Sequence, residues 1–153
     1  MSFITTAYLD IVTAQSYFDG RLGTECWDTA DDADKTKALL QATRSIDRLN
    51  FVGLKSDEAQ ELQFPRNGDT VVPSDIMAAC AEEALALING LDPEMERESL
   101  AVVQQEFGKA KVKFDRETAR PIYILHGIMS STAWSYLKPY LRDPLTMRIS
   151  RTS

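Results

Sequence analysis

Residues 31–49 read DDADKTKALLQATRSIDRL and form the clearest amphipathic pattern in the chain. Apolar residues recur there at spacings of three and four, which places them on one face of an α-helix. These residues are Ala38, Leu39, Ala42, Ile46 and Leu49. The aspartates at the start suit the positive end of a helix dipole, and Gly53 is a natural stop. We therefore expect a helix over residues 31–49.

A second helix is predicted downstream, where residues 73–90 read PSDIMAACAEEALALING. Ser74 is its expected N-cap, and Asn89 and Gly90 are expected to end it after Ile88. Its apolar stripe is Ile76, Cys80, Ala84, Leu87 and Ile88. The small side chains of this segment predict a close approach to another helix: Ala78, Ala79, Ala81 and Ala84.

The N-terminal region predicts a short helix over residues 14–21, with Thr13 as its N-cap. Trp27 follows in an acidic stretch that is expected to be a loop. We interpret Trp27 as an anchor at the edge of the core, the alternative being a platform for a ligand.

The hydrophobic period changes after Leu100. Residues 109–114 alternate polar and apolar, so a β-hairpin is expected over about residues 100–115, with Gly108 in its turn. A last helix is predicted from Ser130 through Trp134 to Leu141. The expected fold is mainly α: a small helical bundle over residues 1–141 with this hairpin as an insertion, followed by an extended basic tail over residues 142–153.

The composition is that of a globular protein. The 153 residues are 44% hydrophobic and 26% charged, and no apolar run reaches the roughly 18 residues of a membrane span. No signal peptide is visible, and two cysteines are too few for a disulfide framework. We therefore expect reduced thiols and a cytoplasmic setting.

Charge is divided unevenly along the chain. Residues 1–100 hold 8 Lys and Arg residues against 19 Asp and Glu residues, whereas residues 101–153 hold 9 against 4. An acidic body with a basic end suits head-to-tail association of copies or docking onto an acidic partner. It suits nucleic-acid wrapping poorly, since phosphates attract positive charge. The other interpretation is that the acidic residues form a solvated face.

The motifs of catalysis and cofactor binding are missing. His126 is the sole histidine and has no partner motif for a zinc site or a nucleophile relay, so neither enzyme activity, metal nor cofactor is expected. The aspartates at residues 31–34 are explained by helix capping. Trp134 shares helical spacing with Leu137 and Leu141, which favours burial over stacking on nucleic-acid bases.

The order of several motifs resembles the small head–tail connector, or adaptor, proteins of tailed bacteriophages. These motifs are Thr13-Ala14, Tyr17-Phe18, Arg21 and Trp27; the helix KALLQATRSIDRLNFVG at residues 37–53; Gln60, Leu62 and Phe64-Pro65-Arg66; and Pro73, Ile76, Ala79 and Glu83-Ala84, followed by the predicted hairpin to Phe114. The resemblance covers about residues 5–115, with Phe64 where members usually carry Trp. Some members of the same group are labelled DnaT-like single-stranded DNA-binding proteins.

The resemblance implies a structural protein of the virion, located at its head–tail neck and in the host cytoplasm during assembly. Such adaptors form a homo-oligomeric ring, typically a dodecamer, beneath the portal protein. The ring extends the DNA channel and provides a docking surface for tail components, and genome DNA passes through it without sequence-specific binding. The alternative function is single-stranded DNA binding.

Two sets of residues are the candidate sites under this interpretation. The tail is expected to bind the portal or a neighbouring copy through Arg142, Leu145, Met147, Arg148, Ile149 and Arg151. A second set is expected to be either structural or at a subunit interface: Arg21, Trp27, Phe64, Pro65 and Arg66. In the structural alternative, Phe64 fills the edge of the core and Arg66 pairs with a carboxylate.

Overall fold

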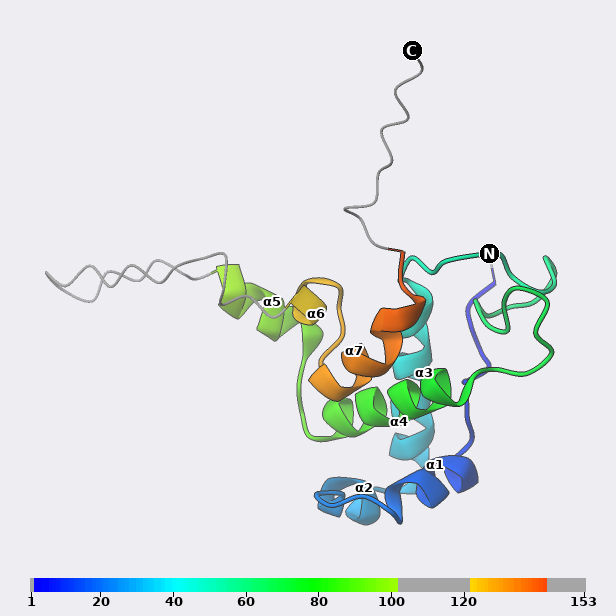
Figure 1. Ribbon diagram of the computed structural model, residues 1–153. Helices are drawn as coiled ribbons and strands as arrows, with labels where there is room; N and C mark the ends of the chain where they lie inside the picture. The colour runs from blue at the N-terminus through cyan, green and yellow to red at the C-terminus, as the bar shows by residue number, and fades with distance from the viewer. Residues whose placement is uncertain (1, 102–121, 143–153) are drawn as a thin grey trace, which may run out of the picture.

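A computed structural model of the chain describes residues 2–101 and 122–142, which are mainly helical (Figure 1). The helices are α1 (Ile11–Phe18), α2 (Glu25–Thr29), α3 (Asp32–Asp47), α4 (Ser74–Ile88), α5 (Pro93–Ala101), α6 (Ile122–Leu125), α7 (Ser131–Leu137) and the 3₁₀ helix η1 (Lys138–Tyr140). Within these ranges β pairing is limited to two isolated bridges, Phe51 with Leu141 and Lys55 with Arg66. No helix there has the length and apolar character needed to cross a membrane.

The β-hairpin expected over residues 100–115 lies almost wholly outside the described residues. Its first two residues, Leu100 and Ala101, are described, and they belong to α5 instead of a strand. The strand prediction is therefore wrong at its start, because the helix that begins at Pro93 continues through these residues. The tail beyond Arg142 also lies outside the described part of the chain.

The prediction of a helix near residues 31–49 is confirmed by α3. The Asp31 side chain accepts a hydrogen bond from the backbone N–H of Asp34 at 2.7 Å, which satisfies one of the free donors at the helix start. The helix ends at Asp47, and the backbone N–H of Leu49 then bonds to the carbonyl of Ile46.

Helix α4 spans the predicted residues, but its expected cap is wrong. Pro73 occupies the cap position, and its carbonyl accepts from the backbone N–H groups of Ile76 and Met77, so Ser74 is the first residue of the helix. The expected end is confirmed, since Gly90 follows α4 with a φ of 87°, a conformation that favours glycine.

Helix α1 also begins earlier than predicted. Asp10, and not Thr13, is its N-cap, and the Asp10 side chain accepts from the Thr13 backbone N–H at 2.7 Å. Trp27 lies in the short helix α2 instead of a loop and is fully buried. Its indole N–H donates to the side-chain oxygen of Gln15 at 3.1 Å. Both the apolar ring and the polar N–H group of Trp27 therefore have partners inside the molecule.

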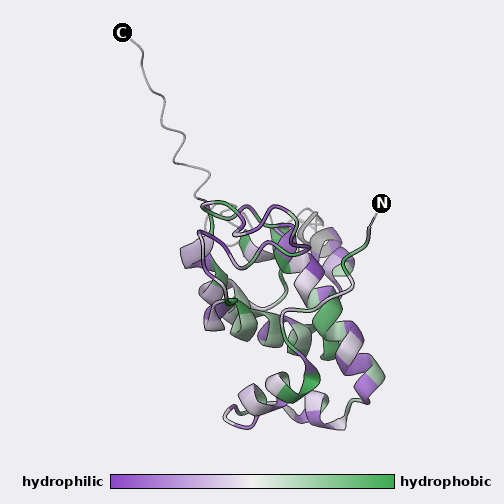
Figure 2. Cartoon of the chain, turned by 90° about the vertical axis from the view of Figure 1, so that its right-hand side faces the viewer, coloured by the Kyte–Doolittle hydropathy of each residue, from purple (hydrophilic) through white to green (hydrophobic). Residues whose placement is uncertain are grey.

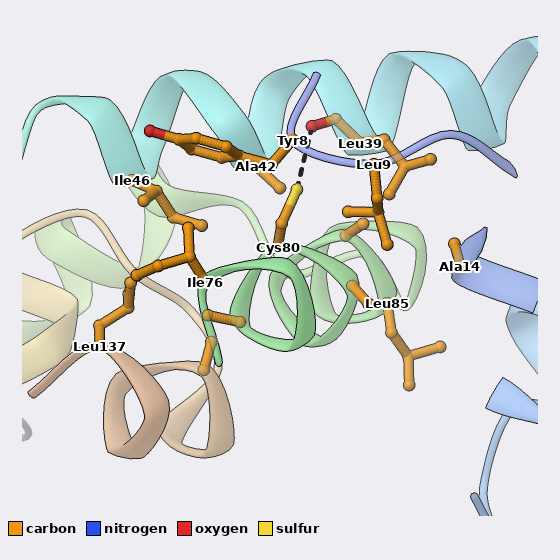
Figure 3. Packing of buried hydrophobic residues seen from close by; sticks show 14 of the residues in the cluster. Tyr8, Leu9, Ala14, Leu39, Ala42, Ile46, Ile76, Cys80, Leu85 and Leu137 are labelled. Carbon is orange, nitrogen blue, oxygen red and sulfur yellow. Dashed lines mark hydrogen bonds between the residues drawn. The ribbon is translucent and has the colours of Figure 1, made fainter. Parts of the chain in front are cut away.

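The core forms where α3 crosses α4 at a steep angle (Figures 1 and 3). Ala42 of α3 and Cys80 of α4 lie between the two helices, and α4 carries three further fully buried alanines, Ala79, Ala81 and Ala84. Small side chains let two helix backbones approach closely, as the alanine content of α4 predicts. The Cys80 thiol lies 3.3 Å from the Thr43 hydroxyl and 3.6 Å from the carbonyl oxygen of Leu39, so even the polar groups of the crossing are partnered.

The remaining helices cover the two sides of α4. Helix α7 packs along it and adds the fully buried Ala133 and Leu137 to the core, while α1 adds Ala14 and Phe18. The helix predicted from Ser130 is confirmed at its start, where the Ser130 hydroxyl caps α7 by accepting from the Ala133 backbone N–H at 3.1 Å. It ends at Leu137 instead of Leu141, and the 3₁₀ helix η1 follows. In Figure 2 apolar and polar segments alternate along the helices, as expected for helices that are buried on one side.

The two cysteines are predicted to differ sharply in reactivity. Burial raises the pKa of the Cys80 thiol to about 12, whereas Cys26 is exposed. Because the thiolate is the nucleophile, an aromatic disulfide reagent should label one thiol in the native protein at pH 8 and both in urea. The Cys26→Ser variant should lose the native reaction. Rapid labelling of two thiols without denaturant would contradict the packing of α3 on α4.

Candidate nucleic-acid interface

A groove of about 580 Å³ runs along the side of α3 that faces away from α4. It is lined by α3, by the start of α5 and by the turn after α6. The lining residues are Lys37, Leu40, Gln41, Arg44, Ser45, Arg48, Asp92, Pro93, Glu94, His126 and Gly127.

The α3 wall is basic. Lys37, Arg44 and Arg48 follow one another at helical spacing with Gln41, and all four side chains are exposed. They lie opposite the apolar stripe of the same helix, so the packing of the core determines which way they face. The Arg44 guanidinium donates twice to the carbonyl oxygen of Ile4, at 2.8 and 3.1 Å, which fixes the middle of the row.

The opposite wall is acidic and short. Asp92 accepts from the backbone N–H of Glu94 at 2.9 Å, which starts α5. Both carboxylates line the groove across from the three cations. An anionic strand entering the groove would therefore be attracted to the α3 wall and repelled from the α5 wall.

One aromatic ring of a stacked pair, that of His126, lines the groove. The rings of His126 and Trp134 are stacked, with centroids 5.4 Å apart and an interplanar angle of 11°. Trp134 is half-buried and packs against the core, while His126 is exposed and lines the groove. Gly127 has a φ of 82°, a left-handed conformation that turns the chain directly after His126.

A buried carboxylate holds the segment that follows this turn. Glu83 on α4 is fully buried, and its side chain accepts from the backbone N–H groups of Met129 at 2.9 Å and Ser130 at 3.0 Å. Burial raises the pKa of Glu83, and these hydrogen bonds oppose the rise. The position of the turn after His126 is thus tied to the core helix.

The sequence-predicted residues Arg21, Phe64, Pro65 and Arg66 lie outside this groove. Arg21 pairs with Glu82 of α4 at 2.6 Å. Phe64 is buried in the connection between α3 and α4, with ring neighbours Tyr8, Phe51 and Tyr140, and a cis peptide bond joins it to Pro65. Arg142 is exposed, whereas Leu145, Met147, Arg148, Ile149 and Arg151 lie outside the described residues.

Arg66 is buried, but the expectation that it pairs with a carboxylate is wrong. Its guanidinium donates to the carbonyl oxygens of Val52, Gly53 and Gln63 and to the side-chain oxygen of Gln63. Backbone carbonyls replace the acid because the chain doubles back there. Gly53 has a φ of 83°, and a Cβ on it would lie 1.9 Å from the Asn67 amide oxygen. The position where the chain passes Asn67 therefore requires glycine.

The basic row on α3 was missed by sequence reasoning, which weighed total charge. The described ranges contain 10 Lys and Arg residues against 19 Asp and Glu residues, so the body is acidic as a whole. The available signal was the spacing of Lys37, Gln41, Arg44 and Arg48 on the polar face of the helix. His126 was considered only as a zinc ligand or a catalytic group. No group of residues suited to hold a metal ion occurs in the described part of the chain.

A groove that combines a row of cations with an exposed aromatic ring is typical of proteins that bind single nucleic-acid strands. The sequence matches the family described as "Putative DnaT-like ssDNA binding protein" over residues 5–152, so the chain belongs to this family. This match does not support the head–tail connector family that the motifs resemble. No curated protein and no solved structure matches the chain.

The contacts of Arg66 predict a structural effect on mutation. Arg66→Ala removes the buried guanidinium that donates to three partly buried carbonyls and should lower the free energy of unfolding by about 2 kcal/mol. Arg48→Ala, an exposed matched change, should alter it by less than about 0.5 kcal/mol. Urea unfolding followed by circular dichroism measures both. An Arg66→Ala protein of normal stability that no longer self-associates would instead assign Arg66 to a subunit interface.

Proposed function

We propose that this protein binds single-stranded DNA in the groove beside α3. Membership of the DnaT-like family supports the ligand class. The observation that carries the proposal is the row of three exposed cations on one face of α3, at the same groove as an exposed aromatic ring. The proposed role is binding and not catalysis.

The spacing of the row suits a strand more than a single anion. Lys37 and Arg48 are eleven positions apart, which corresponds to about 16 Å of helix at a rise of about 1.5 Å per residue. Charges spread over that length can contact several phosphates of one strand. The core-facing stripe of the same helix keeps them in line.

The acidic body sets a limit on the strength of binding. Carboxylates outside the groove repel a long polyanion, but at physiological ionic strength they act only over about 8 Å. A short strand held against the α3 wall is therefore screened from most of them. Binding should be modest in affinity and strongly dependent on salt.

The salt dependence is a direct test. With three phosphates neutralised, the logarithm of the binding constant should fall with the logarithm of salt concentration with a slope of about 2. Arg48→Gln should lower the slope by about 0.7, because one phosphate contact is lost. Lys138→Gln is the control, since Lys138 is exposed on η1 and does not line the groove.

Fluorescence anisotropy with a labelled oligothymidylate measures both variants. Equal loss in Arg48→Gln and Lys138→Gln would place the contact elsewhere on the surface. No binding by the unaltered protein at 50 mM salt would overturn the proposal.

A second candidate function is the ring-forming head–tail adaptor, located at the neck of the virion. Besides the motif resemblance, exposed apolar side chains favour it. Val52, Leu54 and Val71, all in the connection between α3 and α4, are 53%, 79% and 72% exposed, and Leu22 is 93% exposed. Exposed apolar groups that gather into one patch mark surfaces that other proteins cover. The proposed partners are further copies of this chain, a portal ring and tail components.

Native mass tests the adaptor function. Twelve chains of 17.1 kDa should add about 205 kDa to the portal ring of the corresponding phage. Leu54→Ser should weaken this assembly if the apolar surface is the contact, whereas Lys138→Gln should leave it unchanged. A portal ring whose mass does not change on mixing would remove the adaptor function from consideration.

A further inference from the structure

We propose that the outer face of the His126 ring is a stacking platform for one unpaired base. This inference rests on the proposed binding of single-stranded DNA and adds the element that distinguishes a single strand from a duplex. It starts from the placement of the ring, which is exposed at the surface and yet stacked nearly parallel to the Trp134 ring, with the centroids 5.4 Å apart.

The platform is rigid. Trp134 packs against the core and supports the inner face of the imidazole. The backbone N–H of His126 bonds to the carbonyls of Ile122 and Tyr123 at 3.3 and 3.1 Å, which anchors the residue to α6. Beyond the turn, Glu83 holds the start of α7. A ring fixed in this way loses little conformational freedom when a base stacks on it.

The platform is also correctly placed for a strand. His126 lines the same groove as Arg44 and Arg48, whereas Trp134 is not among its lining residues. Phosphates attracted to the α3 wall would leave the bases free to turn toward His126. The carboxylates of Asp92 and Glu94 on the other wall disfavour the reverse arrangement, with phosphates there.

This arrangement selects unpaired bases for a physical reason. Every base has an aromatic face that can stack on a side-chain ring, which makes the contact tolerant of sequence. In a duplex both faces of an internal base are already covered by its neighbours, so it cannot extend the stack of His126 and Trp134. The groove should prefer a single strand to a duplex that carries the same number of phosphates.

An oligonucleotide without bases provides the matched ligand. A 15-nucleotide oligothymidylate and an abasic 15-mer carry the same phosphates, so the row on α3 contacts them equally. At 50 mM salt the unaltered protein should bind the oligothymidylate about tenfold more tightly, a ratio in the range measured for one stacked base. His126→Ala should lower the affinity for oligothymidylate about tenfold, and His126→Phe should restore it. Lys138→Gln should retain the tenfold ratio.

The possible outcomes separate the two proposals. Equal affinity of the unaltered protein for both oligonucleotides overturns the platform while leaving phosphate binding in place. Binding of neither oligonucleotide overturns both proposals. A His126→Ala protein with an undiminished tenfold ratio also overturns the platform. Thermal unfolding monitored by circular dichroism checks that the His126 variants remain folded, as expected for an exposed side chain.

Discussion

The rest of the structure depends on the close crossing of α3 and α4. Ala42 and Cys80 are fully buried between the two helices, and a larger side chain at either position would force the helices apart. Because the inner face of α3 is fixed against α4, the direction of its outer face is fixed as well. The row of Lys37, Arg44 and Arg48 therefore owes its alignment to packing on the other side of the helix.

Two adjacent carboxylates on α4 bind segments on different sides of the helix. Glu82 accepts from the Tyr17 hydroxyl at 2.7 Å and pairs with Arg21, both from the α1 region. Glu83 accepts from backbone N–H groups at the start of α7. Successive side chains on a helix point about 100° apart, so a Glu-Glu pair can hold two different neighbours. These buried acids are partnered, as buried charges must be.

Periodicity predicted α3, α4 and α7 from the sequence because each buries one face. It could not predict the caps of α1 and α4, where Asp10 and Pro73 compete with the hydroxyl residues that follow them. It also could not provide the partners of Arg66, which are carbonyls brought together by a doubled-back chain. Periodicity could not predict the groove for the same reason. Three segments far apart in sequence line it, and their meeting depends on tertiary packing.

The core is completed by residues near the end of the described chain. Its last buried members, Ile128, Ala133 and Leu137, come after the long connection that leaves α4 at Ile88. During synthesis the surface of α4 that they cover must stay open until this distant segment leaves the ribosome. The entropy of closing such a loop grows only logarithmically, by about 0.6 kcal/mol per doubling of length. The connection can therefore change greatly in length over evolution while the same helices still close the core.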